Sequence, residues 1–193
     1  FDYTFRYNNK NLISLKHSTE GIGDIVLNAK YQLLKEEGWF LPNFSLRTAL
    51  KLPTGKKDDL LGSGEVDYGA GLLLDKSFLN KIYIYAGANV IFIEKPSFFS
   101  ELGIDKEYFT GIVAMEYFFT DRFSVVSQVS GNTTPYPFSD TTVLDNNGYE
   151  FGLGFNYTLK EKDNISLYFA IIENIKAASS PDVSFDTGLK CVF

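Results

Sequence analysis

Large apolar residues and small or polar residues alternate along most of this chain. The segment Gly148–Leu159 shows the pattern most clearly: its odd positions carry only Tyr, Phe and Leu, and its even positions carry Glu, Gly, Asn and Thr. Successive side chains of an extended strand point to opposite faces, so this order gives one apolar and one polar face. A helix would mix the two sets around its surface. The pattern therefore predicts a β-strand.

The same alternation recurs and predicts ten strands, rich in β-branched and aromatic residues. The uncharged apolar run Ile82–Ile93 has twelve residues. A membrane-spanning helix needs about 20 residues, whereas a tilted membrane-spanning strand needs about 9–11. The predicted strands are Phe1–Tyr7, Asp24–Leu34, Asn43–Leu52, Glu65–Asp75, Ile82–Phe92, Tyr108–Phe119, Phe123–Ser130, Gly148–Leu159, Asn164–Glu173 and Val183–Phe193.

Short and long connections alternate between these strands. The short ones are Lys35–Pro42, Lys76–Lys81, Thr120–Arg122 and Lys160–Asp163, and the longer, polar ones are Asn8–Gly23, Pro53–Gly64, Ile93–Glu107 and Gly131–Asn147. Short turns on one rim and long loops on the other are typical of outer-membrane barrels. The sequence predicts one all-β domain over residues 1–193, an antiparallel up-and-down transmembrane β-barrel with ten strands, or twelve if further strands precede the chain.

Alternation is also compatible with a soluble barrel, in which the apolar face would point inward. Three features favour the membrane. From Asp24 onward the apolar faces carry no charge, and the opposite faces are rich in Gly, Ser and Asn. Glycine weakens a strand surface that faces water, whereas small residues leave room inside a narrow lumen. Aromatic residues gather at the strand ends, as in the girdles of membrane barrels: Tyr31, Phe44, Phe92, Phe109, Tyr117, Phe119, Phe123, Tyr149 and Tyr157.

The last predicted strand ends on an aromatic residue. Phe193 shares its apolar face with Phe185, Leu189 and Cys191. A terminal Phe on the apolar face resembles the final strand of bacterial outer-membrane proteins, which implies that Phe193 serves as a signal for the outer-membrane assembly machinery. We expect the bacterial outer membrane as the location and the lipid bilayer as a partner.

Composition narrows the functions further. Lys and Arg number 18 against 24 Asp and Glu, a formal net charge of −6. This balance argues against a nucleic-acid partner, which requires clusters of basic residues. One Cys and one His exclude an intramolecular disulfide framework and any multi-His or Cys-based metal site. The 31 aromatic residues and the lack of helix-favouring blocks agree with an all-β protein.

Three segments carry a resemblance to a known family. They are GIGDIVLNAKYQLL (residues 21–34), SLRTALKLPTG (residues 45–55) and LGSGEVDYGAGLLL (residues 61–74). Together they resemble poorly characterised outer-membrane barrels, similar to the MetA-pathway phenol-degradation barrels and their relatives of unknown function. The resemblance implies an outer-membrane location and uptake of small, apolar molecules, and it supplies no catalytic residues. It also implies strands ahead of the GIGD segment.

The residues that invite catalytic interpretations have simpler explanations. His17 is followed by Ser18 and Glu20, but adjacent residues of an extended segment point apart, so a Ser–His–acid arrangement is not supported. Asp58 and Asp59 lie beside two lysines in a polar loop and are expected to be solvated. We therefore expect no enzymatic activity, no cofactor and no metal site.

The polar faces carry the candidate functional residues. Seven acids and four bases are predicted to line the lumen: Asp24, Glu65, Asp67, Asp75, Glu116, Glu150 and Asp186, with Lys30, Arg47, Lys51 and Lys190. They are expected either to form a network that fills the lumen or to favour cations along a water path. An eight-stranded barrel is filled by its own side chains and an open porin needs about 16 strands. We expect a narrow channel for small solutes; the alternative is a structural or anchoring barrel within an envelope complex, with other envelope proteins as partners.

Two pairings follow from this arrangement. If Pro53–Gly64 joins neighbouring strands, facing residues have numbers that sum to about 116, so Arg47 and Lys51 should reach Glu65 or Asp67. If the barrel closes on itself, Val183–Phe193 should run antiparallel to Phe1–Tyr7, because an open edge is not tolerated in lipid.

Overall fold

The computed structural model describes residues 3–7, 10–15, 20–59, 61–95, 104–135, 146–160, 165–176 and 182–191. The strands are β1 (Tyr3–Tyr7), β2 (Lys10–Leu15), β3 (Ile25–Leu34), β4 (Asn43–Leu52), β5 (Asp67–Phe78), β6 (Ile82–Phe92), β7 (Glu107–Thr120), β8 (Phe123–Asn132), β9 (Gly148–Lys160), β10 (Ile165–Lys176) and β11 (Val183–Cys191). The described part contains a single 3₁₀ turn, Lys57–Asp59, and no helix long and apolar enough to cross a membrane.

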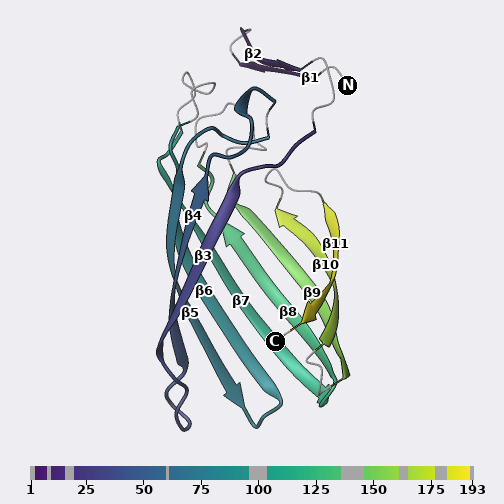
Figure 1. Cartoon of the computed structure of the whole chain (residues 1–193). Helices are drawn as coiled ribbons and strands as arrows, with labels where there is room; N and C mark the ends of the chain where they lie inside the picture. Colours follow the sequence, from purple (N-terminus) through teal and green to yellow (C-terminus); the bar gives the residue numbers. More distant parts are fainter. Residues whose placement is uncertain are drawn as a thin grey trace.

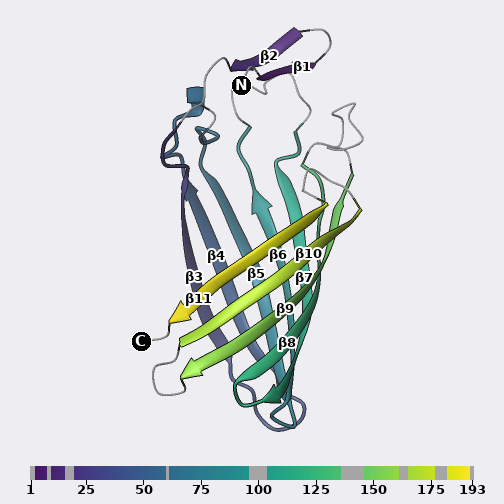
Figure 2. The ribbon, with the colours of Figure 1, turned by 90° about the vertical axis from the view of Figure 1, so that its right-hand side faces the viewer.

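Nine strands form one antiparallel meander in the order β11-β10-β9-β8-β7-β6-β5-β4-β3, each paired with its neighbour in sequence. The predicted up-and-down arrangement is confirmed, and nine of the ten predicted strands belong to this sheet. The sheet curls about its long axis: in Figure 2, β10 and β11 pass in front of β4, β5 and β6. The β3–β4, β5–β6 and β7–β8 turns lie at the lower end of the sheet in Figure 1, and the β4–β5 loop lies at the upper end.

The predicted closure of the barrel through its two terminal strands is wrong. β1 pairs with β2 in a separate two-stranded sheet, and within the described residues β3 and β11 each have one strand neighbour. Lys10–Leu15 was predicted to be part of a loop. It forms β2 instead, and only two residues separate it from β1. Pairing with so close a segment costs less loop-closure entropy than pairing with β11. Phe1 and Phe193 lie outside the described residues.

The sheet buries polar side chains and exposes large apolar ones, the reverse of the distribution in a water-soluble protein. Buried side chains in the described part are few, and three of them are polar: Ser45, Ser124 and Glu116. Large apolar side chains are exposed on every strand of the nine-stranded sheet, among them Leu27, Leu46, Tyr68, Leu72, Ile84, Val113, Val129, Phe151, Phe169 and Phe185. Along β5 each odd-numbered residue from Asp67 to Leu73 is less exposed than its even-numbered neighbours. The less exposed face is the concave face of the curled sheet.

The concave face was predicted to carry small and polar residues, but it also contains large apolar side chains. Leu73 and Ile112 lie on it beside Gly87, whose position leaves room for both: a Cβ there would lie 3.0 Å from Leu73 Cδ2 and 3.2 Å from Ile112 Cγ2. Tyr83 and Phe118 also face this side, with ring centroids 5.3 Å apart. Small residues on this face therefore accommodate large neighbours, as a curled sheet requires.

Gly71 tests this packing. A Cβ at this position would meet Asn89 Oδ1 and lie 2.7 Å from the carbonyl oxygen of Ala88, so Gly71→Leu should lower the free energy of unfolding by about 1–3 kcal/mol, as overpacking does. Ala70→Leu, one residue away on the exposed face, is the matched control and should have little effect. Chemical denaturation of the purified variants measures both. Equal destabilisation by the two variants would show that the faces are wrongly assigned.

Candidate functional site

The strand pairings bring the predicted lumen residues onto one face. Asp75 lies opposite Tyr85, Tyr85 opposite Ala114, and the row continues through Gln128, Gly152 and Ile172 to Ser184. Positions two residues apart on a strand share this face. The concave face thus carries nine of the predicted residues: Lys30, Arg47, Lys51, Asp67, Asp75, Glu116, Glu150, Asp186 and Lys190. Asp24 and Glu65 precede β3 and β5, at the rim with the long loops.

Glu116 is the centre of a polar network that joins four strands. It is only 9% exposed. Its Oε2 accepts a hydrogen bond from the Tyr85 hydroxyl at 2.8 Å, and its Oε1 accepts from Ser124 Oγ at 2.5 Å and from Asn156 Nδ2 at 3.1 Å. No basic side chain forms an ion pair with it among the described residues. The hydrogen-bond donors to Glu116 in this network are therefore the neutral side chains of Tyr85, Ser124 and Asn156.

Lys51 forms the predicted link between β4 and β5. Its ammonium lies 2.5 Å from Asp67 Oδ2 and 3.3 Å from Asp24 Oδ2. The predicted register was offset: Lys51 faces Asp67, so the facing residue numbers sum to 118 rather than 116. An offset of two residues preserves the faces, because side chains alternate with a period of two.

The predicted ion pair of Arg47 is wrong. Arg47 faces Gly71 across β4 and β5, which puts Asp67 four positions further along β5. Its guanidinium instead donates to Asn28 Oδ1 on β3 at 3.1 Å. Lys30 is the direct neighbour of Arg47 on β3. Such a like-charged pair is tolerated because both side chains are exposed at the edge of the sheet.

The three segments behind the family resemblance meet at Asp24. Its Oδ1 accepts the backbone N–H of Gly55 at 3.0 Å, and its Oδ2 accepts that of Ser63 at 3.2 Å. Thr54 Oγ1 donates to the carbonyl oxygen of Gly23 at 3.0 Å. The hydrogen bonds from Asp24 reach residues 31 and 39 positions later in the sequence. The GIGD, LPTG and GSG elements thus form one cluster that fixes the β4–β5 loop to the start of β3.

Glycine is required in this cluster because the backbones approach closely. A Cβ on Gly55 would collide with the backbone of Leu61, lying 2.7 Å from its carbonyl carbon, and one on Gly62 would collide with the carboxylate of Asp24. These collisions explain why glycine occupies positions 55 and 62. The cluster is therefore an anchor for the loop at the long-loop rim.

The same contacts change the acidity of Asp24. The N–H of Gly55 contributes most, and Ser63 N–H and Lys51 add to it, so the pKa of Asp24 lies below its ordinary value of 3.8 in spite of desolvation. The carboxylate is therefore charged whenever the fold is intact near neutral pH.

A second polar cluster lies at the rim with the short turns. Lys76 Nζ lies 3.0 Å from Glu36 Oε1, and Glu36 also accepts a hydrogen bond from Ser77 Oγ at 2.7 Å. Asn43 Nδ2 donates to Asp75 Oδ2 at 2.5 Å. Glu36 and Lys76 were not predicted as site residues, because both lie in predicted connections. The alternation of apolar and polar residues does not indicate that these two connections meet.

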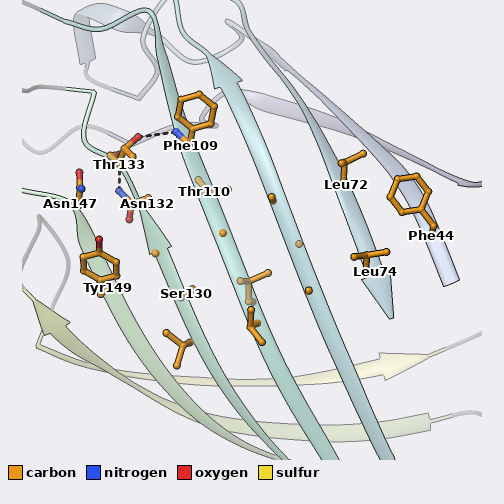
Figure 3. A pocket seen from close by; sticks show the side chains of 18 residues that line it. Phe44, Leu72, Leu74, Phe109, Thr110, Ser130, Asn132, Thr133, Asn147 and Tyr149 are labelled. Atoms are coloured by element: carbon orange, nitrogen blue, oxygen red, sulfur yellow. Dashed lines mark hydrogen bonds between the residues drawn. The ribbon is translucent and has the colours of Figure 1, made fainter. Parts of the chain in front are cut away.

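An apolar groove of about 650 Å³ crosses the exposed face over β4 to β9. Figure 3 shows Phe44, Leu72 and Leu74 on one side of it and Phe109 and Tyr149 on the other. Ala86, Ala88, Gly111 and Gly131 form its floor. Asn132, Thr133 and Asn147 lie at the end nearest the long loops. The groove contains no ionisable group other than the phenol of Tyr149.

Among the described residues, no group of three or more His, Cys, Asp and Glu could hold a metal ion. Cys191 is exposed on the edge strand β11. Asp58 and Asp59 belong to the 3₁₀ turn in the β4–β5 loop, and His17 lies outside the described residues.

Comparison with protein-family models identifies the family of this chain. A family model described as "Protein of unknown function (DUF3187)" matches residues 1–193. No curated protein matches the chain. The match covers the whole chain, including the cluster at Asp24 and the network at Glu116.

Asp24→Asn should loosen the long-loop rim. It removes the charge that pairs with Lys51, and we expect the free energy of unfolding to fall by about 1.5–3 kcal/mol at pH 7, as for hydrogen bonds to a charged group. Because the folded-state pKa is lowered, this stabilisation is present above pH 3.8 and is lost as the pH falls through the folded-state pKa. The difference between wild type and variant should shrink accordingly in denaturation curves. Asp58→Asn, in the same loop and exposed, should do little at any pH; an equal effect of both variants would contradict the anchor.

Proposed function

We propose that this chain, which belongs to the DUF3187 family, is a bacterial outer-membrane β-barrel that forms a narrow channel for small solutes. The observation that carries the proposal is the reversed distribution of polarity. Buried positions in the described part include Glu116 and Ser124, whereas large apolar side chains are exposed along the strands. Exposing so much apolar surface to water is unfavourable, while a lipid bilayer solvates it without penalty.

The positions of the aromatic residues support a bilayer as the surrounding medium. On the exposed face, Tyr117 and Phe119 pack edge to face with ring centroids 4.7 Å apart near the short turns. Tyr68 and Phe92 stack at 5.0 Å near the long loops. Aromatic residues at both ends of an apolar band are expected where strands cross the two membrane interfaces.

Strand parity sets a condition for closing the proposed barrel. β3 and β11 are the first and ninth strands of an antiparallel meander, so they run in the same direction. An all-antiparallel barrel therefore requires an odd number of further strands between them. One strand would make ten and three would make twelve, and both totals are even, as in bacterial single-chain barrels.

The concave face supports a channel that favours cations. Seven acids and four bases were assigned to this face and its rim, and Glu116 and Asp75 are held by neutral partners rather than by bases. The rings of Tyr83 and Phe118 lie on this face near the short turns, with centroids 5.3 Å apart. A barrel of ten to twelve strands lies between a filled barrel and an open porin. The resemblance to the phenol-degradation barrels points to small molecules as solutes.

The adjacent residues Leu72 and Leu73 test the membrane assignment, because they lie on opposite faces of β5. In vesicles, Leu72→Arg should lower the free energy of unfolding by about 2–4 kcal/mol, as charges on a lipid-facing surface do, and Leu73→Arg should cost less. Urea titration of the reconstituted variants measures both effects. If the protein instead folds in water, the order reverses, because Leu72 is the more exposed of the two.

Glu116→Gln tests the channel. This variant keeps hydrogen-bond capacity but removes the charge, so the preference for cations over anions in planar-bilayer recordings should fall. Glu173→Gln is the matched control. Glu173 is exposed on the opposite face of β10, so the expectation of an apolar face without charge does not hold at this position. Its loss should leave selectivity unchanged. If the reconstituted wild-type protein inserts but does not conduct, the channel is excluded and the alternative, a structural or anchoring barrel in an envelope complex, takes its place.

A further inference from the structure

The turn between β3 and β4 exposes a cluster of large apolar side chains. Trp39 is 65% exposed and Phe40 is 90% exposed, and Leu41 is exposed beside them. Leu79, in the neighbouring turn between β5 and β6, is 83% exposed. We refer to Trp39, Phe40 and Leu41 as the aromatic turn; it lies at the lower end of the sheet in Figure 1.

Polar contacts of the largely covered Lys76 side chain order the backbone of the aromatic turn. The ammonium of Lys76, whose side chain is 12% exposed, lies 3.0 Å from Glu36 Oε1. It also donates to the carbonyl oxygens of Gly38 at 2.6 Å and of Leu41 at 3.2 Å. Glu37 and Leu41 pair through two backbone hydrogen bonds. Gly38 adopts φ = 57°, a left-handed conformation that glycine accepts most readily.

These contacts matter because they order the backbone that carries the exposed side chains of Trp39 and Phe40. A loop in water would gain entropy by remaining mobile, whereas here the ion pair and several hydrogen bonds order the backbone that presents Trp39 and Phe40. Preorganisation of this kind lowers the cost of contact with a partner. The turn is therefore built to present its aromatic residues to something other than water.

The partner is identified by position and chemistry. Lys76 and Phe78 lie on the same face of β5 as Leu72 and Leu74, by strand alternation, and Trp39 packs edge to face on Phe78 with ring centroids 5.5 Å apart. The aromatic turn therefore continues the exposed apolar face beyond the strand ends. Trp combines an apolar body with an N–H donor, which suits the boundary between acyl chains and headgroups.

We propose that the aromatic turn inserts into the headgroup–acyl boundary of the membrane leaflet on the short-turn side and anchors the barrel there. This inference rests on the proposed membrane location and adds the specific contact. The exposed ionisable side chains on the two turns are Lys35, Glu37 and Lys81, a net positive set that is compatible with lipid phosphates.

Trp39 is the chain's single tryptophan, so its fluorescence reports on the turn directly. The full chain is reconstituted in phosphatidylcholine vesicles, and insertion is verified by flotation with the vesicles. We expect blue-shifted emission, and stronger quenching by lipid brominated high on the acyl chain than by lipid brominated near its terminal methyl. The double variant Trp39→Phe, Lys56→Trp moves the tryptophan to a highly exposed position at the opposite rim and should show neither effect.

The outcomes separate this inference from the membrane proposal. If the protein floats with the vesicles but Trp39 emits as in water and is not quenched, the anchor is overturned while the membrane location stands, and the turn is left as a surface for a protein partner. If the protein does not float with vesicles under conditions in which it is folded, both proposals fail. Lys76→Met should supply a second readout: it removes the ammonium that orders the turn, and we expect a broader distribution of quenching depths with unchanged flotation.

Discussion

The backbone hydrogen bonding of a continuous antiparallel ladder is the constraint on which this structure depends. Each strand from β3 to β11 pairs with its sequence neighbour, so the polar groups of the main chain are satisfied by the sheet itself rather than by a surrounding solvent. Because the main-chain N–H and C=O groups are paired within the sheet, the side chains on one face can be apolar without leaving backbone polar groups unpaired. Most charged side chains of the strands lie on the other face, where the curl of the sheet brings several of them within reach of one another, whereas Lys76 and Glu173 lie on the apolar face near strand ends.

The ladder explains why the buried groups are polar. Ser124 is 1% exposed because it lies on the concave side, where Glu116 and Asn156 approach it from the adjacent strands β7 and β9. Such a network is stable only when each member is satisfied, since an unpaired buried polar group is costly. The interior of this protein is thus organised by hydrogen bonds, and apolar contacts are confined largely to its outer surface and to a few residues such as Leu73.

Two ionic clusters fix the ends of the sheet. At the long-loop rim, Lys51 joins Asp24 and Asp67; at the short-turn rim, Lys76 joins Glu36 and the carbonyl groups of the β3–β4 turn. Both place a lysine against backbone or carboxylate oxygens of a connection. The two clusters hold connections that the ladder alone would leave free, and one of them presents the aromatic turn.

The sequence by itself determined the positions of the nine strands of the main sheet to within a few residues, and the face of most of their side chains. Ile82–Phe92 and Asn43–Leu52 coincide with β6 and β4, because a period of two is a local property that each segment carries alone. Only the tertiary structure decided which strand pairs with the N-terminal segment, the register that sets Lys51 against Asp67, the meeting of Asp24 with Gly55 and Ser63, and the contact between Glu36 and Lys76. The side-chain contacts join residues that lie 16 to 40 positions apart. β1 pairs with Lys10–Leu15, which is nearer along the chain than β11. Alternation cannot choose between registers two residues apart, since both keep the same faces, so turn geometry and loop-closure entropy make that choice.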